Sequence, residues 1–127
     1  LMINFLRKLS TFGFGKNAVG HWIWQRITAF LMILLFGWTI FSFRNLFYNF
    51  EENFYLWIKN RLNLFLFITL IIIVMHHSLL GIINICEDYI TSKKIKRYSM
   101  NTLKLVTLIL ISLSIFSLLS ITNLISL

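Results

Sequence analysis

Residues 62–86 read LNLFLFITLIIIVMHHSLLGIINIC, and this run contains no aspartate, glutamate, lysine or arginine. A helix needs about 20 predominantly apolar residues to cross the roughly 30 Å hydrocarbon core of a bilayer. The whole chain also lacks proline, so nothing in the run removes a backbone donor or kinks a helix. Because a helix satisfies its own backbone hydrogen bonds in lipid, the run is predicted to form a transmembrane helix.

Two further apolar runs, at about residues 22–43 and 103–124, are also long enough to span a bilayer. Of the 127 residues 58% are hydrophobic and only 13% are charged, which excludes an ordinary soluble domain. The sequence therefore predicts an all-α membrane protein. It would consist of a basic N-terminal tail, residues 1–21, and a three-helix transmembrane anchor over residues 22–127.

Lysine and arginine residues outside the three runs are concentrated on one predicted side of the membrane. Cytoplasmic segments keep an excess of positive charge during insertion, so this side, with the N-terminus, is predicted to face the cytoplasm or the mitochondrial matrix. The first loop, on the opposite side, carries fewer cations, and two glutamates dilute them. The larger group comprises Arg7, Lys8, Lys16, Lys93, Lys94, Lys96, Arg97 and Lys104, and the smaller group Arg44, Lys59 and Arg61.

The formal net charge of +8 does not indicate nucleic-acid binding, because that function needs a basic face on a folded soluble module. A basic loop beside a membrane span is typical of an orientation signal that also meets anionic lipid headgroups. The same loop could dock an acidic partner surface. Cys86 is the single cysteine, so no intramolecular disulfide is possible, and we expect a small buried apolar residue rather than a metal ligand.

Two adjacent histidines, His76 and His77, interrupt the apolar run, where an ionisable side chain costs free energy. At about 100° per residue, the face of the helix that carries His77 also carries Gly81, Asn84 and Asp88. We expect the His76 ring to point in a different direction and to be supporting or structural. Two interpretations of His77 stay open: an axial haem ligand, with room for the macrocycle beside Gly81, or a hydrogen bond to a neighbouring helix.

The stretch GHWIWQRITAF, residues 20–30, places Arg26 about one turn inside the membrane on the predicted basic side. Arg26 shares a helix face with Trp22. Its guanidinium could extend to the lipid headgroups or bind an anionic group such as a haem propionate. Trp22 and Trp24 are expected in the aromatic belt at the membrane interface, and His21 lies at the same boundary.

Asp88 and Tyr89 end the second run on the same predicted side, and Tyr89 lies twelve residues, or about 18 Å, from His77. Together with GHWIWQRITAF, the stretch HHSLLGIINICEDYI resembles the small membrane-anchor subunit of succinate dehydrogenase (respiratory complex II), the D subunit or cytochrome b small subunit. That family has a histidine, a glycine four residues later, and an acidic–tyrosine pair ending twelve residues after the histidine. His77, Gly81, Asp88 and Tyr89 match this pattern in register.

The resemblance implies that His77 is an axial ligand of haem b and that the larger cytochrome b anchor subunit supplies the second ligand. It implies that Arg26 contacts a haem propionate or the quinone pocket. Tyr89 would hydrogen-bond a ubiquinone carbonyl, and Asp88 would support that site. The other partners would be an iron–sulfur subunit and a flavoprotein subunit, and the chain itself would perform no succinate chemistry. The implied location is the mitochondrial inner membrane or, alternatively, a bacterial cytoplasmic membrane.

Two other functions fit the residues alone. A cofactor-free structural or assembly subunit of another respiratory membrane complex would use the histidines as interhelical hydrogen-bond partners. A small proton or ion transporter would use His76, His77 and Arg26 as a path. The transporter is disfavoured, because no broken helix is predicted and the third run has no ionisable group after Lys104.

Overall fold

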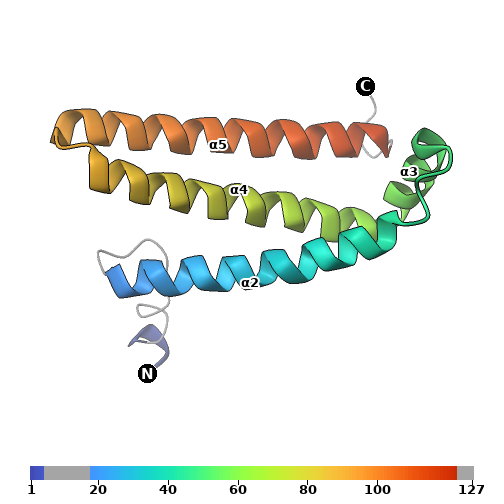
Figure 1. Cartoon of the computed structure of the whole chain (residues 1–127), viewed down its shortest axis with the longest axis horizontal. Coiled ribbons are helices and arrows are strands. Elements are labelled where there is room, and N and C mark those ends of the chain that lie inside the picture. Colours follow the sequence, from blue (N-terminus) through green and yellow to red (C-terminus); the bar gives the residue numbers. More distant parts are fainter. Residues whose placement is uncertain (5–17, 123–127) are drawn as a thin grey trace.

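The structure, a computed structural model, describes residues 1–4 and 18–122. Its helices are α2 (Ala18–Phe43), α3 (Phe50–Lys59), α4 (Arg61–Tyr89) and α5 (Lys93–Ile121). Figure 1 shows α4 between α2 and α5, and α4 packs against both of them. The described residues contain no strand, which confirms the predicted all-α fold.

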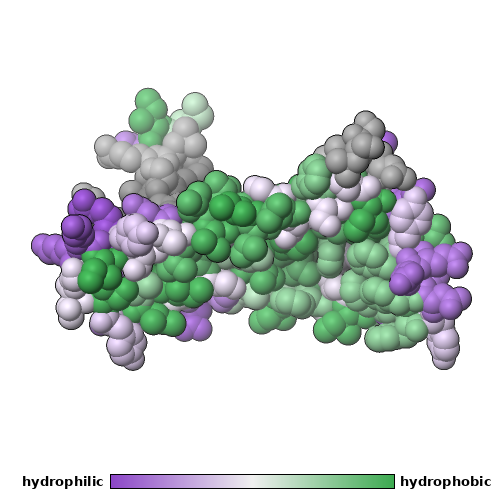
Figure 2. All heavy atoms as spheres, turned by 90° about the horizontal axis from the view of Figure 1, so that it is seen from above, coloured by the Kyte–Doolittle hydropathy of each residue, from purple (hydrophilic) through white to green (hydrophobic). Residues whose placement is uncertain are grey.

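Three of these helices are long and apolar enough to cross a membrane: residues 20–43, 61–89 and 93–121. Most of their large apolar side chains are exposed, and the few buried ones lie along the contacts between helices. Figure 2 shows the exposed apolar side chains as a band over the middle of the molecule, with hydrophilic residues at its two ends. This distribution is what a lipid-facing surface requires. The chain is therefore an integral membrane protein with three spans, as predicted.

The helices extend beyond the apolar runs that predicted them. The third helix begins at Lys93 rather than near residue 103, because the basic residues before the apolar run are good helix formers and no proline or glycine interrupts them. The first helix likewise begins at Ala18 and the second ends at Tyr89. Hydropathy marks the part of a helix that lies in lipid, not the whole helix. The rest of the basic tail, residues 5–17, and the end of the third run, residues 123–124, lie outside the described residues.

The first loop contains a short helix, α3, that the sequence analysis did not predict. Its glutamates at positions 51 and 52 and the lysine at position 59 lie in the first and last turns, where they complement the helix dipole. The chain enters α3 through Asn49, which has a left-handed backbone with φ of 51°. The Asn60 side chain then caps α4 by accepting a hydrogen bond from the Leu62 backbone N–H at 3.0 Å.

The inner face of α3 closes one end of the bundle. Ile58 is fully buried and packs with Leu64 of α4 and Leu118 of α5. Trp57 lies beside it, with its ring centroid 5.0 Å from that of Phe43 on α2 and 5.7 Å from that of Phe67 on α4. All three long helices are thus joined to α3 by apolar contacts. The opposite end, where α2 and α5 begin and α4 ends, is called the basic end below (Figure 1).

Replacing Ile58 tests this apolar closure. Ile58→Ala removes a fully buried side chain at the junction of α3, α4 and α5, so we expect a loss of about 2–5 kcal/mol in the free energy of unfolding. Leu56 on the same helix is 60% exposed, and Leu56→Ala serves as the matched control. Thermal unfolding of the detergent-solubilised protein, followed by circular dichroism, measures both. Equal stability of the two variants would contradict the packing described.

Candidate functional site

Three side-chain hydrogen bonds cross from α2 to α4 near the basic end. The Trp24 Nε1–H donates to Nε2 of His76 at 2.7 Å, and Oγ1 of Thr28 lies 2.9 Å from Nδ1 of His77. Asn84 Nδ2 donates to Oε1 of Gln25 at 3.1 Å. We call these six residues the polar seam. In an apolar medium such bonds hold helices together, typically contributing about 0.6 kcal/mol each and up to about 2 kcal/mol.

Both histidines contact α2, although their positions on α4 are predicted to point in different directions. Their partners, Trp24 and Thr28, lie four residues apart and therefore on the same face of α2. The side chains of adjacent residues on α4 leave the helix axis about 100° apart. Because α2 lies between these two directions, both histidine rings reach it. The predicted face of His77 is confirmed in part, because Asn84 also bonds to α2.

His76 and His77 contact α2 through different ring nitrogens. His76 accepts the tryptophan N–H through Nε2, and the two rings meet edge to face with centroids 6.2 Å apart. His77 contacts Thr28 through Nδ1. Among the residues that the structure describes, none forms a hydrogen bond to Nε2 of His77. The two neighbours therefore differ in the ring nitrogen that contacts α2.

Gly81 faces the polar seam, and there is room for a side chain at its position. A Cβ atom at Gly81 would meet only Nε2 of Gln25, at an ordinary contact distance of 3.9 Å. The packing of α2 on α4 thus does not require a glycine at this position. The prediction that Gly81 leaves room for a haem stays a prediction.

Arg26, Asp88 and Tyr89 lie near the seam on exposed surface. The Arg26 guanidinium carbon lies 5.2 Å from the ring centroid of Trp22, one turn earlier, as their shared face predicted. Tyr89, at the last turn of α4, is 81% exposed, and Asp88 beside it is exposed as well. Within the described ranges no hydrogen bond or ion pair joins these residues or His21 to one another. Among the described residues these side chains thus do not form a hydrogen-bonded cluster.

Sequence reasoning missed half of the seam. Trp24 was expected in the interfacial belt with Trp22, yet it is only partly exposed and bonds to His76, while Trp22 is 56% exposed. Gln25 and Thr28 were not singled out. Two polar side chains three residues apart in an apolar helix are the signal that could have identified them, since they share one face. Cys86 is a free cysteine and is only partly buried in this chain, whereas a buried residue was predicted.

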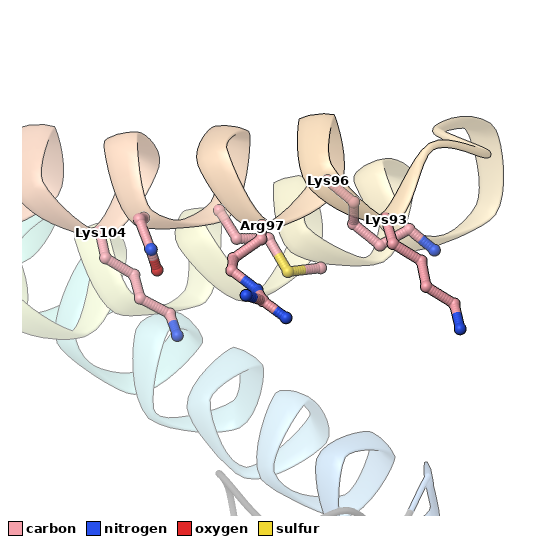
Figure 3. A pocket seen from close by; sticks show the side chains of 6 residues that line it. Lys93, Lys96, Arg97 and Lys104 are labelled. Carbon is pink, nitrogen blue, oxygen red and sulfur yellow. The ribbon is translucent and has the colours of Figure 1, made fainter.

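Basic side chains line a shallow groove along the first turns of α5. Its lining residues recur at three- and four-residue intervals and therefore share one face of the helix. Figure 3 shows the four cationic side chains of the groove projecting from that face. The ammonium group of Lys96 donates to the backbone carbonyl of Glu87 at 3.2 Å, which ties this part of α5 to the end of α4. The lining residues are Lys93, Lys96, Arg97, Met100, Asn101 and Lys104.

Residues 5–119 match a family described as succinate dehydrogenase/fumarate reductase transmembrane subunit. The chain belongs to this family. The match spans nine-tenths of the sequence and includes every residue of the polar seam, so the predicted resemblance is confirmed. No solved structure matches the chain.

Two curated relatives carry the name succinate dehydrogenase hydrophobic membrane anchor subunit. The protein from Rickettsia bellii is 32% identical over 90% of this chain and 83% of its own length. The protein from Rickettsia prowazekii is 31% identical over 87% of this chain and 85% of its own length. A transmembrane subunit of the succinate dehydrogenase/fumarate reductase family is thus the coarse identity of the chain.

The seam offers one donor suited to a haem. The described residues contain no group of three or more histidine, cysteine, aspartate or glutamate side chains that could hold a bare metal ion. A b-type haem has a different requirement, because the porphyrin supplies four nitrogens and the protein only axial ligands. Nε2 of His77 is a donor of the kind that one axial position of a haem takes.

The bond between Gln25 and Asn84 can be tested by a double-mutant cycle. Gln25→Leu or Asn84→Leu alone leaves one amide unpaired, so each should cost about 1–3 kcal/mol. The double variant should recover about 0.6–2 kcal/mol of the summed loss. Thermal unfolding in detergent measures all four proteins. Asn84→Leu combined with Thr39→Val, on a distant turn of α2, is the control pair, for which the losses should simply add.

Proposed function

We propose that the chain is an anchor subunit of succinate dehydrogenase that contributes one axial ligand of haem b and part of the ubiquinone site. Its family membership supports the anchor role. The observation that carries the haem role is the contact of His77 with α2 through Nδ1, which leaves Nε2 for iron. His76 is disfavoured as the ligand because the indole N–H of Trp24 occupies its Nε2.

The surroundings of His77 suit a bound porphyrin. Gly81 follows one helical turn later and presents no side chain, and a flat macrocycle needs such space beside its ligand. Arg26 is exposed on α2 and could bind a propionate with charge-assisted hydrogen bonds. A bound haem b would supply a one-electron carrier. The second axial ligand would come from the larger cytochrome b anchor subunit.

The proposed ubiquinone site lies at the end of α4. The exposed phenol of Tyr89 can donate a hydrogen bond to a quinone carbonyl oxygen, where negative charge develops as the quinone is reduced. Asp88, the preceding residue, would support the site or its supply of protons. Electrons would arrive from succinate through the iron–sulfur and flavoprotein subunits, which carry out the chemistry that this chain does not.

The basic end would face those subunits. The cations of α5 lie on the same side as Tyr89, so an acidic surface of the iron–sulfur subunit could dock there within reach of the quinone. The positive-inside rule predicts that this end faces the cytoplasm or the matrix. The Rickettsia relatives support a bacterial cytoplasmic membrane, and the mitochondrial inner membrane stays a prediction.

A structural subunit without a cofactor is the second candidate, and one observation favours it. Both histidines already bond to α2, so neither needs a haem to account for its place in an apolar helix. The two functions differ in what happens to Nε2 of His77. An optical spectrum of the purified complex decides between them.

Replacing each histidine in turn tests haem ligation. In the complex carrying His77→Ala we expect the Soret and α bands of haem b to disappear, because iron loses an axial ligand. His76→Ala is the matched control and should retain both bands, because that ring faces Trp24. An unchanged spectrum in the His77 variant, or equal loss in the two variants, would contradict ligation by His77.

Removing the Tyr89 hydroxyl tests the quinone role. A hydrogen bond to a charged group contributes about 1.5–3 kcal/mol, so Tyr89→Phe should lower the rate of succinate-to-quinone electron transfer about tenfold to a hundredfold. Succinate oxidation by an artificial acceptor should be unchanged. Tyr98→Phe is the control, since Tyr98 is 75% exposed at the same end but on α5. An equal fall in both activities would indicate defective assembly instead of a lost contact with quinone.

A further inference from the structure

The structure assigns Thr28 as the residue that positions the proton of His77. We infer that its hydroxyl holds this proton on Nδ1 and so presents the Nε2 lone pair to haem iron. The inference rests on the proposed haem role of His77. It adds a residue on α2 that acts through the ligand without touching iron.

Counting protons gives the direction of the bond. A threonine hydroxyl carries one proton, and Thr28 Oγ1 donates it to the backbone carbonyl of Gln25 at 3.0 Å. The same oxygen lies 2.9 Å from Nδ1 of His77. If the hydroxyl donated to the ring, the bond to Gln25 would be lost. Both bonds form together only when Nδ1 carries a proton and donates it, and a neutral imidazole then has its lone pair on Nε2.

Burial makes this arrangement persistent. Thr28 is only 3% exposed, so water has little access to replace either partner. Its side chain is β-branched and has few rotamers in a helix, and the bond to the carbonyl three residues earlier selects one of them. The acceptor oxygen is therefore fixed in place before any haem binds.

Other helical threonines show that this contact is not a general property of the residue. The hydroxyls of Thr39, Thr69, Thr102 and Thr107 each donate to the carbonyl four residues earlier on their own helix. Of the threonines described in α2, α4 and α5, Thr28 alone also hydrogen-bonds a side chain of another helix. Its hydroxyl thus bonds both within its own turn of α2 and across to α4.

In the neighbouring pair of the seam, Trp24 and His76, the histidine accepts a hydrogen bond instead of donating one. Trp24 has only a donor, so its N–H occupies Nε2 of His76. Thr28 instead accepts from Nδ1 of His77. Two residues on one face of α2 thus decide which of two adjacent histidines can bind iron through Nε2.

The bond also affects the iron electronically. A hydrogen bond from the far nitrogen of a ligating imidazole makes the ligand more basic, which stabilises ferric over ferrous haem. Removing the acceptor should therefore raise the midpoint potential of the haem and weaken its retention. Loss of such an outer partner commonly costs about tenfold to a hundredfold in affinity for the metal.

Three variants of the purified complex test the assignment. Thr28→Val keeps the shape of the side chain and removes the hydroxyl, and Thr28→Ser restores the hydroxyl. Thr39→Val removes a buried α2 hydroxyl whose hydrogen bond goes to the Leu35 carbonyl of its own helix. Potentiometric titration of the haem, its low-spin EPR g values and the haem content per complex are measured in each.

We expect Thr28→Val to shift the equilibrium between ferric and ferrous haem about tenfold toward the reduced form, which is about 59 mV for one electron. Its g values should change, whereas Thr28→Ser and Thr39→Val should resemble the unaltered protein. If Thr28→Val loses its haem, retention of haem by Thr28→Ser supports the assignment in the same way.

Three outcomes would overturn the assignment of Thr28. In the first, Thr28→Val keeps both the haem and its midpoint potential. In the second, Thr28→Ser behaves like Thr28→Val, and in the third, Thr39→Val has the same effect as Thr28→Val, which would indicate packing alone. The failure of the proposed function gives a different result, because haem b would then persist in His77→Ala. Loss of haem in His77→Ala with no effect of Thr28→Val rejects only the role of Thr28.

Discussion

Side-chain hydrogen bonds between α2 and α4 are the interaction on which the rest of the structure depends. Within lipid, two apolar helices gain nothing from leaving water, so polar contacts and close packing must hold them together. The three bonds of the polar seam also fix the rotation of α4 about its own axis. That rotation determines where the free nitrogen of His77 points and where Tyr89 emerges at the basic end. The proposed haem role would therefore use the same few atoms as the association of the two helices.

The two ends of the bundle are built differently. At the α3 end, Ile58, Leu64 and Leu118 form an apolar cluster that the chain completes by itself. Toward the basic end Leu80 is buried, but other large apolar side chains are exposed, among them Ile82, at 42%, and Ile85, at 58%. Such a surface suits lipid or other membrane subunits. A cofactor shared with a second chain, as proposed for His77, would lie against such an exposed apolar surface.

The sequence predicted what depends on composition and on spacing within one helix. Hydropathy located all three spans, and a four-residue interval correctly paired Arg26 with Trp22. The missed features depend on how helices meet. Helical periodicity gives the face on which His76 lies but not its distance from Trp24, because the relative rotation and shift of α2 and α4 come from packing. The helix α3 was missed because a short amphipathic segment carries no membrane signal and becomes helical against its neighbours.

The basic groove lies on the first turns of α5, which form one unbroken helix, and this continuity limits how the length of the segment can vary. Residues 93–104 belong to one helix that continues into the membrane, so the angular position of its cations is locked to the side that packs on α4. Inserting a single residue between them would turn the preceding charges by about 100° around the axis, whereas seven residues would restore their direction to within about 20°. If this groove docks the iron–sulfur subunit as proposed, relatives should differ in length here by whole heptads and not by single residues.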